Sequence, residues 1–148
     1  MSTEISLGFQ MFNIAKMLHQ AIFLNGTLLN METWPHFSDQ KVAQYERIEQ
    51  GLFRKVLAAH SKTPIECIYL ELGVVPFRFN LITKRIMYYH EIMNRPDDEI
   101  TKKVVLYQRK SNIKGSFYDQ VSVNMNELEI SEEGILTMSH STLKELVK

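Results

Sequence analysis

The chain has 148 residues, 45% of them hydrophobic, and its 17 basic residues balance 17 acidic ones. This length suits one domain with a sizeable core, and the composition excludes wholesale disorder. Zero net charge excludes a globally basic polyanion binder but not a local basic patch. The single cysteine, Cys67, excludes an internal disulfide and a cysteine-rich zinc site. It indicates a reducing, intracellular compartment, nuclear or cytoplasmic.

Helical periodicity and capping residues recur along the whole chain, whereas evidence for strands is thin. The fourth helix carries apolar residues on two faces, which is typical of a central helix. The sequence therefore predicts an all-α, single-domain helical bundle of about six to eight helices around a central helix at about 76–94. The expected helices lie at about Leu7–Asn25, Ser38–Leu57, Thr63–Gly73, Pro76–Asn94, Asp97–Asn112 and Ser116–Leu128, followed by two short helices after Ser131 and Ser139. The expected capping residues are Ser38, Thr63, Ser116 and Ser131. Gly26 is expected to interrupt the first helix, and the segment around Pro35 is either a broken helix or a loop.

No group of residues in the sequence carries enzymatic chemistry. Asp97-Asp98 is the one aspartate pair, but it follows a proline and opens a helix, where an acidic residue is expected as a cap. His90 to Asn94 resembles a zinc-binding HExxH helix in which Asn94 replaces the second histidine. We therefore expect no catalytic residue, no metal ion and no cofactor, and we predict that the chain is not an enzyme.

Glu49 interrupts the apolar face of the second helix, where it projects between Val42 and Val56. A carboxylate there is costly unless a cation or hydrogen-bond donors meet it. Arg78 and Arg85 lie seven residues apart on one edge of the fourth helix and are the obvious candidates. We expect an internal ion pair between Glu49 and one of them; the alternative is an exposed helix edge.

The fifth helix carries a basic face. Lys102 and Arg109 lie on one line along the helix, and Lys103 and Lys110 lie on the neighbouring line. Lys114, just after the helix, extends this face. Both lines lie roughly opposite Ile100, Val104 and Tyr107, which the periodicity predicts to be buried. The face is either an ordinary solvated surface or one that contacts phosphates.

Charge is distributed unevenly along the chain. The region from Arg78 to Lys114 holds nine basic and four acidic residues, whereas the region from Ser116 onward holds two basic and six acidic ones. This pattern indicates either that the acidic C-terminal part packs on the basic middle or that it leaves a binding face open.

The sequence also resembles the region just C-terminal to the polymerase core in reverse transcriptases of non-LTR (LINE-type) retrotransposons. The similarity includes YLELGVVPFR at Tyr69–Arg78, in which the pattern Leu-Glu-Leu-Gly-x-x-Pro-x-Arg is the most specific part, and it covers most of the chain, from about Leu7 to the end. It also includes Asn30–Trp34, Glu46–Leu57, Lys62–Glu66, Lys84–Tyr89, Asp98–Ile100, Lys114-Gly115 and Leu143–Lys148. Where that family often has Gly-Asp-Trp, this chain has Gly115-Ser116-Phe117.

In such enzymes this region contains the helical thumb and the helices after it, which hold the template–product duplex. The resemblance makes Arg78, Lys84, Arg85, Lys102 and Lys103 candidate contacts to a nucleic-acid backbone. The polymerase palm with its catalytic aspartates is absent from this sequence, so we expect a fragment or remnant without polymerase activity.

Two functions are predicted from these patterns. The first is a non-catalytic region that contacts nucleic acid, with RNA or an RNA–DNA duplex as partner and with the missing polymerase core as a further partner. The second is a helical protein-interaction or self-associating scaffold module that has no role with nucleic acid. Neither involves a membrane, since no apolar run approaches the about 20 residues of a membrane-spanning helix.

Overall fold

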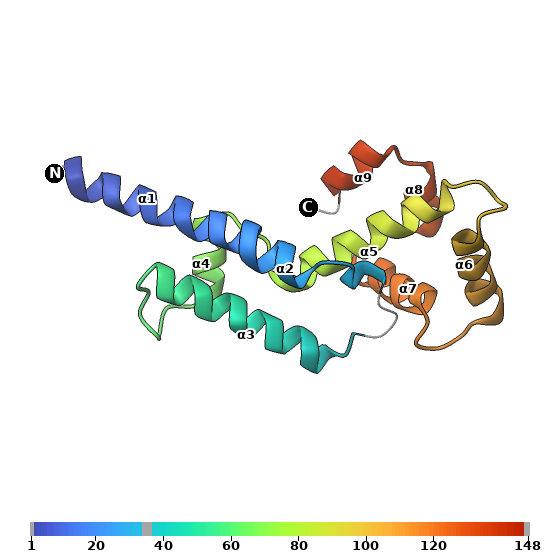
Figure 1. The fold of residues 1–148 in the computed structure, drawn as a ribbon, viewed down its shortest axis with the longest axis horizontal. Helices are drawn as coiled ribbons and strands as arrows, with labels where there is room; N and C mark the ends of the chain where they lie inside the picture. The colour runs from blue at the N-terminus through green and yellow to red at the C-terminus, as the bar shows by residue number, and fades with distance from the viewer. Residues whose placement is uncertain (1, 34–36, 147–148) are drawn as a thin grey trace. The chain divides into compact units, whose positions relative to one another are not determined.

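The computed structural model describes the backbone of residues 2–33 and 37–146, and the side chains of these residues except 2–9, 144 and 146. In this part of the chain all regular elements are helices and no strand occurs, so the all-α prediction is confirmed (Figure 1). The elements are α1 (Ser2–Leu18), η1 (His19–Leu24), α2 (Asn25–Thr27), η2 (Met31–Thr33), α3 (Asp39–Val56), α4 (Ile65–Leu72), α5 (Phe77–Met93), α6 (Ile100–Ser111), α7 (Phe117–Glu127), α8 (Glu132–Thr137) and α9 (His140–Leu146).

Local capping explains where several of these helices begin. A serine side chain at the N-cap accepts a hydrogen bond from a backbone N–H that the helix itself leaves unpaired. The predicted serine caps are confirmed: the Oγ atom of Ser38 accepts from Lys41 at 3.4 Å, that of Ser116 from Asp119 at 3.2 Å and that of Ser131 from Gly134 at 3.1 Å. Gly73 ends α4 with a φ of 60°, a conformation that glycine adopts at little cost.

Other boundaries differ from the predictions. The first helix begins at Ser2 and changes to a π-helix at His19–Leu24, and Gly26 lies within the short α2 instead of interrupting the helix. The N-cap of α4 is Pro64, not Thr63, and its side chain makes no capping hydrogen bond. The predicted interruption at Pro35 lies outside the described residues.

The chain divides into two compact units, Met1–Leu29 with Ser38–Arg78 and Asn30–Phe37 with Phe79–Lys148. In the first unit, a core cluster joins three helices: Ala15 from α1, Phe53 from α3, and Ile68 and Leu72 from α4. The rings of His19 and Phe53 pack with their centroids 4.9 Å apart. The prediction that the whole chain forms one domain stays a prediction.

The second unit is built on α5, the helix predicted at about 76–94. Its buried side chains Ile82, Ile86, Tyr89 and Ile92 form a cluster with residues of four later helices: Val105, Phe117, Val121, Met125, Ile135 and Leu143. Helices α6, α7, α8 and α9 therefore each contribute to a core in which α5 has the largest share.

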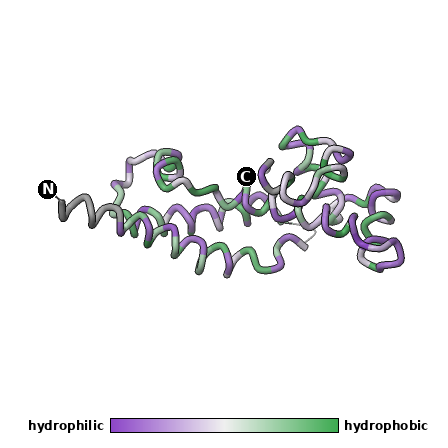
Figure 2. The backbone as a smooth tube through the Cα atoms, turned by 90° about the horizontal axis from the view of Figure 1, so that it is seen from above, coloured by the Kyte–Doolittle hydropathy of each residue, from purple (hydrophilic) through white to green (hydrophobic). Residues whose placement is uncertain are grey.

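The described helices alternate between hydrophilic and hydrophobic residues along their length, as amphipathic helices do (Figure 2). A search of the same residues finds no helix with the length and apolar character needed to cross a membrane.

Candidate nucleic-acid interface

Helix α6 does not begin with an aspartate cap, contrary to the prediction. Its N-cap is Glu99, whose side chain makes no capping hydrogen bond. Asp97 instead pairs with Lys102, whose Nζ lies 2.6 Å from the Asp97 Oδ1 and also donates to the Arg95 carbonyl at 2.8 Å. The hydrogen bond and the charge of Lys102 hold the pKa of Asp97 below its usual range. Both partners of Lys102 lie in the loop between α5 and α6, and only 12% of its side chain is exposed.

The buried face of α6 differs from the predicted one. Val105 packs in the core at 4% exposure, whereas Ile100 is 77% exposed and Tyr107 is 64% exposed. Val104 is exposed as well, so the prediction that these three residues face the core was wrong. The inward side also carries polar residues with partners: the Gln108 Oε1 accepts from the Tyr118 backbone N–H at 3.2 Å. Apolar periodicity could not identify this side, because hydrogen bonds as well as apolar contacts attach it to the unit.

Arg109 lies against an acidic residue of α8. Its Nη1 is 3.1 Å from the Glu132 Oε1, and Glu132 also accepts hydrogen bonds from the hydroxyls of Tyr89 and Tyr118. Burial, together with the hydrogen bond to the Glu132 carboxylate, raises the pKa of Tyr89. One carboxylate therefore joins α5, α6, α7 and α8, and part of the positive charge of Arg109 is neutralised within the molecule.

Lys114 also has a partner in the chain. Its Nζ lies 3.3 Å from the Asp119 Oδ1, and the other oxygen of Asp119 accepts the Gly115 backbone N–H at 2.9 Å. The bond from Gly115, followed by that from Lys114, lowers the pKa of Asp119. The acidic C-terminal part of the chain thus neutralises part of the basic middle.

The three predicted basic residues of α5 have different surroundings. Arg78 belongs to the first unit, where its Nη1 lies 3.7 Å from the Asp39 Oδ1. Arg85 is buried, and this burial lowers the pKa of its guanidinium. Lys84 is exposed. Burial of Arg85 separates it from any surface formed by exposed lysines.

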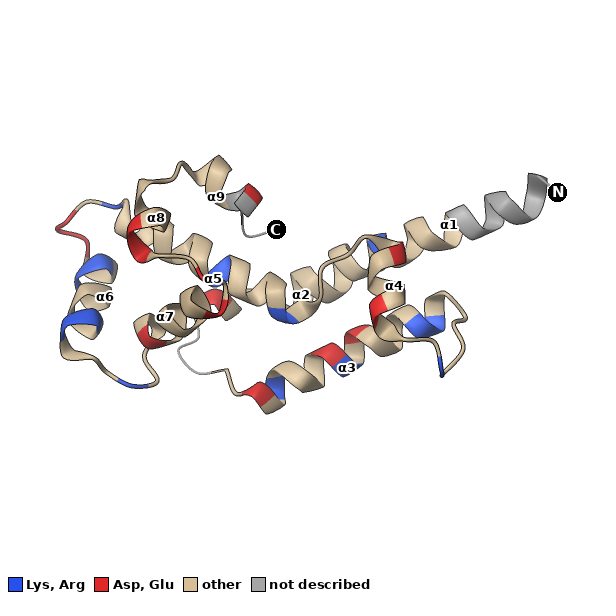
Figure 3. Cartoon of the chain, turned by 180° about the vertical axis from the view of Figure 1, so that it is seen from behind, with Lys and Arg blue, Asp and Glu red and all other residues tan. Residues whose placement is uncertain are grey.

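Two of the predicted basic residues of α6 remain open to solvent. Lys103 and Lys110 are exposed, and no carboxylate of the described residues lies within ion-pair distance of either. They lie seven residues apart, so they project from nearly the same line of the helix. Tyr107 lies on the same side, four residues after Lys103 and three before Lys110, so the prediction that it lies opposite these two lysines was wrong. The basic residues of α6 are visible in Figure 3. We call Lys103, Tyr107 and Lys110 the outer face of α6.

Glu49 is fully buried, as its unusual position on the apolar face of α3 predicted. The predicted ion pair with Arg78 or Arg85 stays a prediction, and the partners that the structure describes are other residues. Its Oε1 accepts from the His19 Nε2 at 2.5 Å, and its Oε2 accepts from the Tyr69 hydroxyl at 2.6 Å and from the Phe77 backbone N–H at 3.1 Å. His19 is not among the residues predicted from the sequence, although its place four residues after Ala15, on the apolar side of the first helix, was a usable signal.

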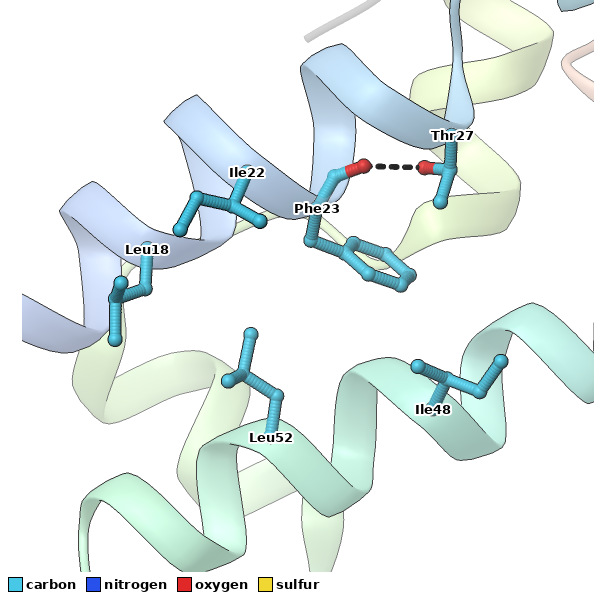
Figure 4. A pocket seen from close by; sticks show the side chains of 6 residues that line it. All are labelled: Leu18, Ile22, Phe23, Thr27, Ile48 and Leu52. Carbon is cyan, nitrogen blue, oxygen red and sulfur yellow. Dashed lines mark hydrogen bonds between the residues drawn. The ribbon is translucent and has the colours of Figure 1, made fainter.

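A second feature of the first unit is an apolar pocket of about 340 Å³ (Figure 4). Leu18, Ile22, Phe23 and Thr27 line it from one side, and Ile48 and Leu52 of α3 line it from the other. The Thr27 hydroxyl already donates to the Phe23 carbonyl at 2.5 Å. The lining therefore offers hydrocarbon surface and no group suited to catalysis.

The residues considered for a metal site serve other contacts. His90 is buried, and its Nε2 lies 3.0 Å from the Met138 carbonyl oxygen. No cluster of three potential metal ligands occurs among the residues that the structure describes.

Comparisons of the chain with protein-family models, with curated proteins and with solved structures found no match.

Proposed function

We propose that this chain is a non-catalytic helical module that contacts nucleic acid through the outer face of α6. The observation that carries the proposal is that Lys103 and Lys110 project from one line of an exposed helix without a carboxylate partner among the described residues. Lysines in this state can replace the counterions of a phosphate backbone, whereas Lys102, Arg109 and Lys114 already have partners inside the molecule.

This surface is smaller than the eight-residue surface that the sequence predicted. Two lysines neutralise about two phosphates, so we expect weak binding without sequence specificity. Nonspecific binding of this kind has a dissociation constant of about 10⁻⁴ to 10⁻⁶ M near physiological salt. Such a module would support the binding of a larger assembly, and by itself it would bind nucleic acid only weakly.

The proposal is tested by fluorescence anisotropy of a labelled oligonucleotide at several salt concentrations. We expect affinity to fall with salt, and the double variant Lys103→Ala/Lys110→Ala to lower the log–log slope by about 1.4 for a single strand. The matched control is Lys41→Ala/Lys55→Ala, which removes two exposed lysines of α3. Affinity that is independent of salt, or equal slopes for the two double variants, would refute the proposal.

The resemblance to non-LTR retrotransposon reverse transcriptases supports a more specific origin. We propose that the chain derives from the region that follows the polymerase core in such an enzyme and that it acts as an accessory region beside that core. The supporting observation is the similarity of the YLELGVVPFR block together with the long helix that follows it. Finding the missing palm encoded next to this sequence in the same reading frame would support this origin.

A second candidate function is self-association or protein binding through α6. The observation that favours it is the exposure of Ile100 and Val104 beside Tyr107, since exposed apolar strips often mark protein contacts. Light scattering during size-exclusion chromatography tests this candidate. A tight oligomer that ignores nucleic acid would favour it over the first function.

A further inference from the structure

Tyr107 is the exposed aromatic residue at the centre of the outer face of α6. With 64% of its surface open, it contacts no other aromatic ring among the described residues, unlike Tyr88, Tyr89 and Tyr118. A tyrosine offers a large flat surface with two rotatable side-chain bonds, so ordering it against a ligand costs little entropy. Its ring is therefore available for stacking.

The two lysines flank this ring along the helix. Lys103 and Lys110 are separated by about 10 Å along the helix axis at 1.5 Å per residue. A stacked nucleic-acid strand advances about 3.4 Å per nucleotide, so this distance corresponds to about three nucleotides. Two phosphates can thus meet the two lysines while a base between them lies over Tyr107.

We propose that the outer face of α6 binds single-stranded nucleic acid, with an unpaired base stacked on the Tyr107 ring and two phosphates about three nucleotides apart on Lys103 and Lys110. This inference rests on the proposed function and narrows it from nucleic acid in general to strands with unpaired bases. In a duplex the faces of the bases are covered by their neighbours, and only the phosphates remain for the lysines. Aromatic residues beside cationic ones are the arrangement that binds single strands without sequence preference.

The neighbouring side chains are consistent with this ligand. Ile100 and Val104 lie on the same side of α6 and extend the ring with exposed aliphatic surface, against which a second base can pack. No acidic residue occurs within α6 itself, and the N-cap Glu99, four residues before Lys103, pairs with Arg95 at 2.7 Å. RNA and DNA share the stacking base and the phosphate, and both are expected to bind.

The experiment compares four ligands of equal length on the full chain: single-stranded RNA, single-stranded DNA, a duplex, and an abasic strand that keeps the phosphates and lacks bases. Alanine substitution of a stacking residue costs about 1–3 kcal/mol per base, which is about fivefold or more in affinity. We expect both single strands to bind at least about fivefold more tightly than the duplex and the abasic strand.

Three variants separate stacking from general apolar contact. Tyr107→Leu should weaken single-strand binding by about fivefold or more and leave binding of the abasic strand unchanged, whereas Tyr107→Phe should retain binding. Phe79→Leu, at an exposed aromatic residue of α5, is the control and should have no effect.

The outcomes for the proposed function and for this inference are distinct. If all four ligands bind equally and still depend on Lys103 and Lys110, the stacking proposal is overturned while the proposed function stands. If none binds, both fail. If Tyr107→Leu leaves nucleic-acid affinity unchanged and instead dissolves an oligomer, Tyr107 belongs to a protein contact and the stacking proposal is again wrong.

Discussion

The carboxylate of Glu49 joins three parts of the first unit, and its replacement by glutamine tests how this unit is held together. It accepts three hydrogen bonds, from His19, Tyr69 and the Phe77 backbone, while being fully buried. A glutamine keeps the volume but presents one amide group that can only donate. Whichever of the three partners meets the amide group loses its charged acceptor inside a fully buried site.

The magnitude follows from what is lost. Hydrogen bonds to a charged acceptor contribute about 1.5–3 kcal/mol each, and leaving a buried donor without an acceptor costs about 1–3 kcal/mol. For Glu49→Gln we expect a decrease of about 3–5 kcal/mol in the free energy of unfolding, as for other broken buried polar pairs. Tyr69→Phe removes a single donor and should cost about 1–2 kcal/mol.

The assay is urea unfolding followed by far-ultraviolet circular dichroism, with the midpoint and slope fitted for each variant. Glu66→Gln is the matched control, since this glutamate is exposed on α4 and should change stability by less than about 0.5 kcal/mol. A loss below about 1 kcal/mol for Glu49→Gln, with an unchanged slope, would refute the argument that these three hydrogen bonds hold the unit together.

Three further predictions concern local features. Val105→Ala should lower the free energy of unfolding by about 2 kcal/mol because Val105 is in the core, whereas Val104→Ala should lower it by about 0.5 kcal/mol or less. Thermal or urea unfolding measures both, and equal losses would contradict the observed orientation of α6. Gly73→Ala should destabilise the protein by about 1 kcal/mol because the φ of Gly73 is 60°. Gly51→Ala inside α3 should stabilise the protein by up to about 1 kcal/mol, since a Cβ there meets nothing within 4 Å. The same assay compares the two variants. Because the pKa of Asp119 is lowered in the folded protein, its ionised carboxylate stabilises the fold above about pH 4, and this stabilisation is lost as the pH falls through the folded pKa. Asp119→Asn should therefore flatten the acid side of a plot of unfolding free energy against pH.

The sequence predicted the helices well because the signals for them are local. Ser38, Ser116 and Ser131 each cap a helix by reaching a backbone N–H three residues ahead, an interaction that depends only on neighbouring residues. The long helix α5 was predicted within a residue at each end, since Pro76 and Pro96 limit it on both sides.

The candidate site was predicted less completely. The sequence places basic residues along α6 and just after it, but their pairing with Asp97, Glu132 and Asp119 depends on contacts that the periodicity of one helix does not contain. Arg85 shows the same limit: the resemblance made it a candidate contact to a nucleic-acid backbone, and packing around α5 buries it.

The sequence by itself determined the helical class, most helix starts and the fact that Glu49 needs a partner, because propensity, capping and the cost of a buried charge act over a few residues. Tertiary structure decided that His19 and Tyr69 meet Glu49, that Val105 turns inward, and that Lys103 and Lys110 stay outside. Those outcomes depend on which helices pack together, and helix packing is determined by contacts between residues that are far apart in the sequence.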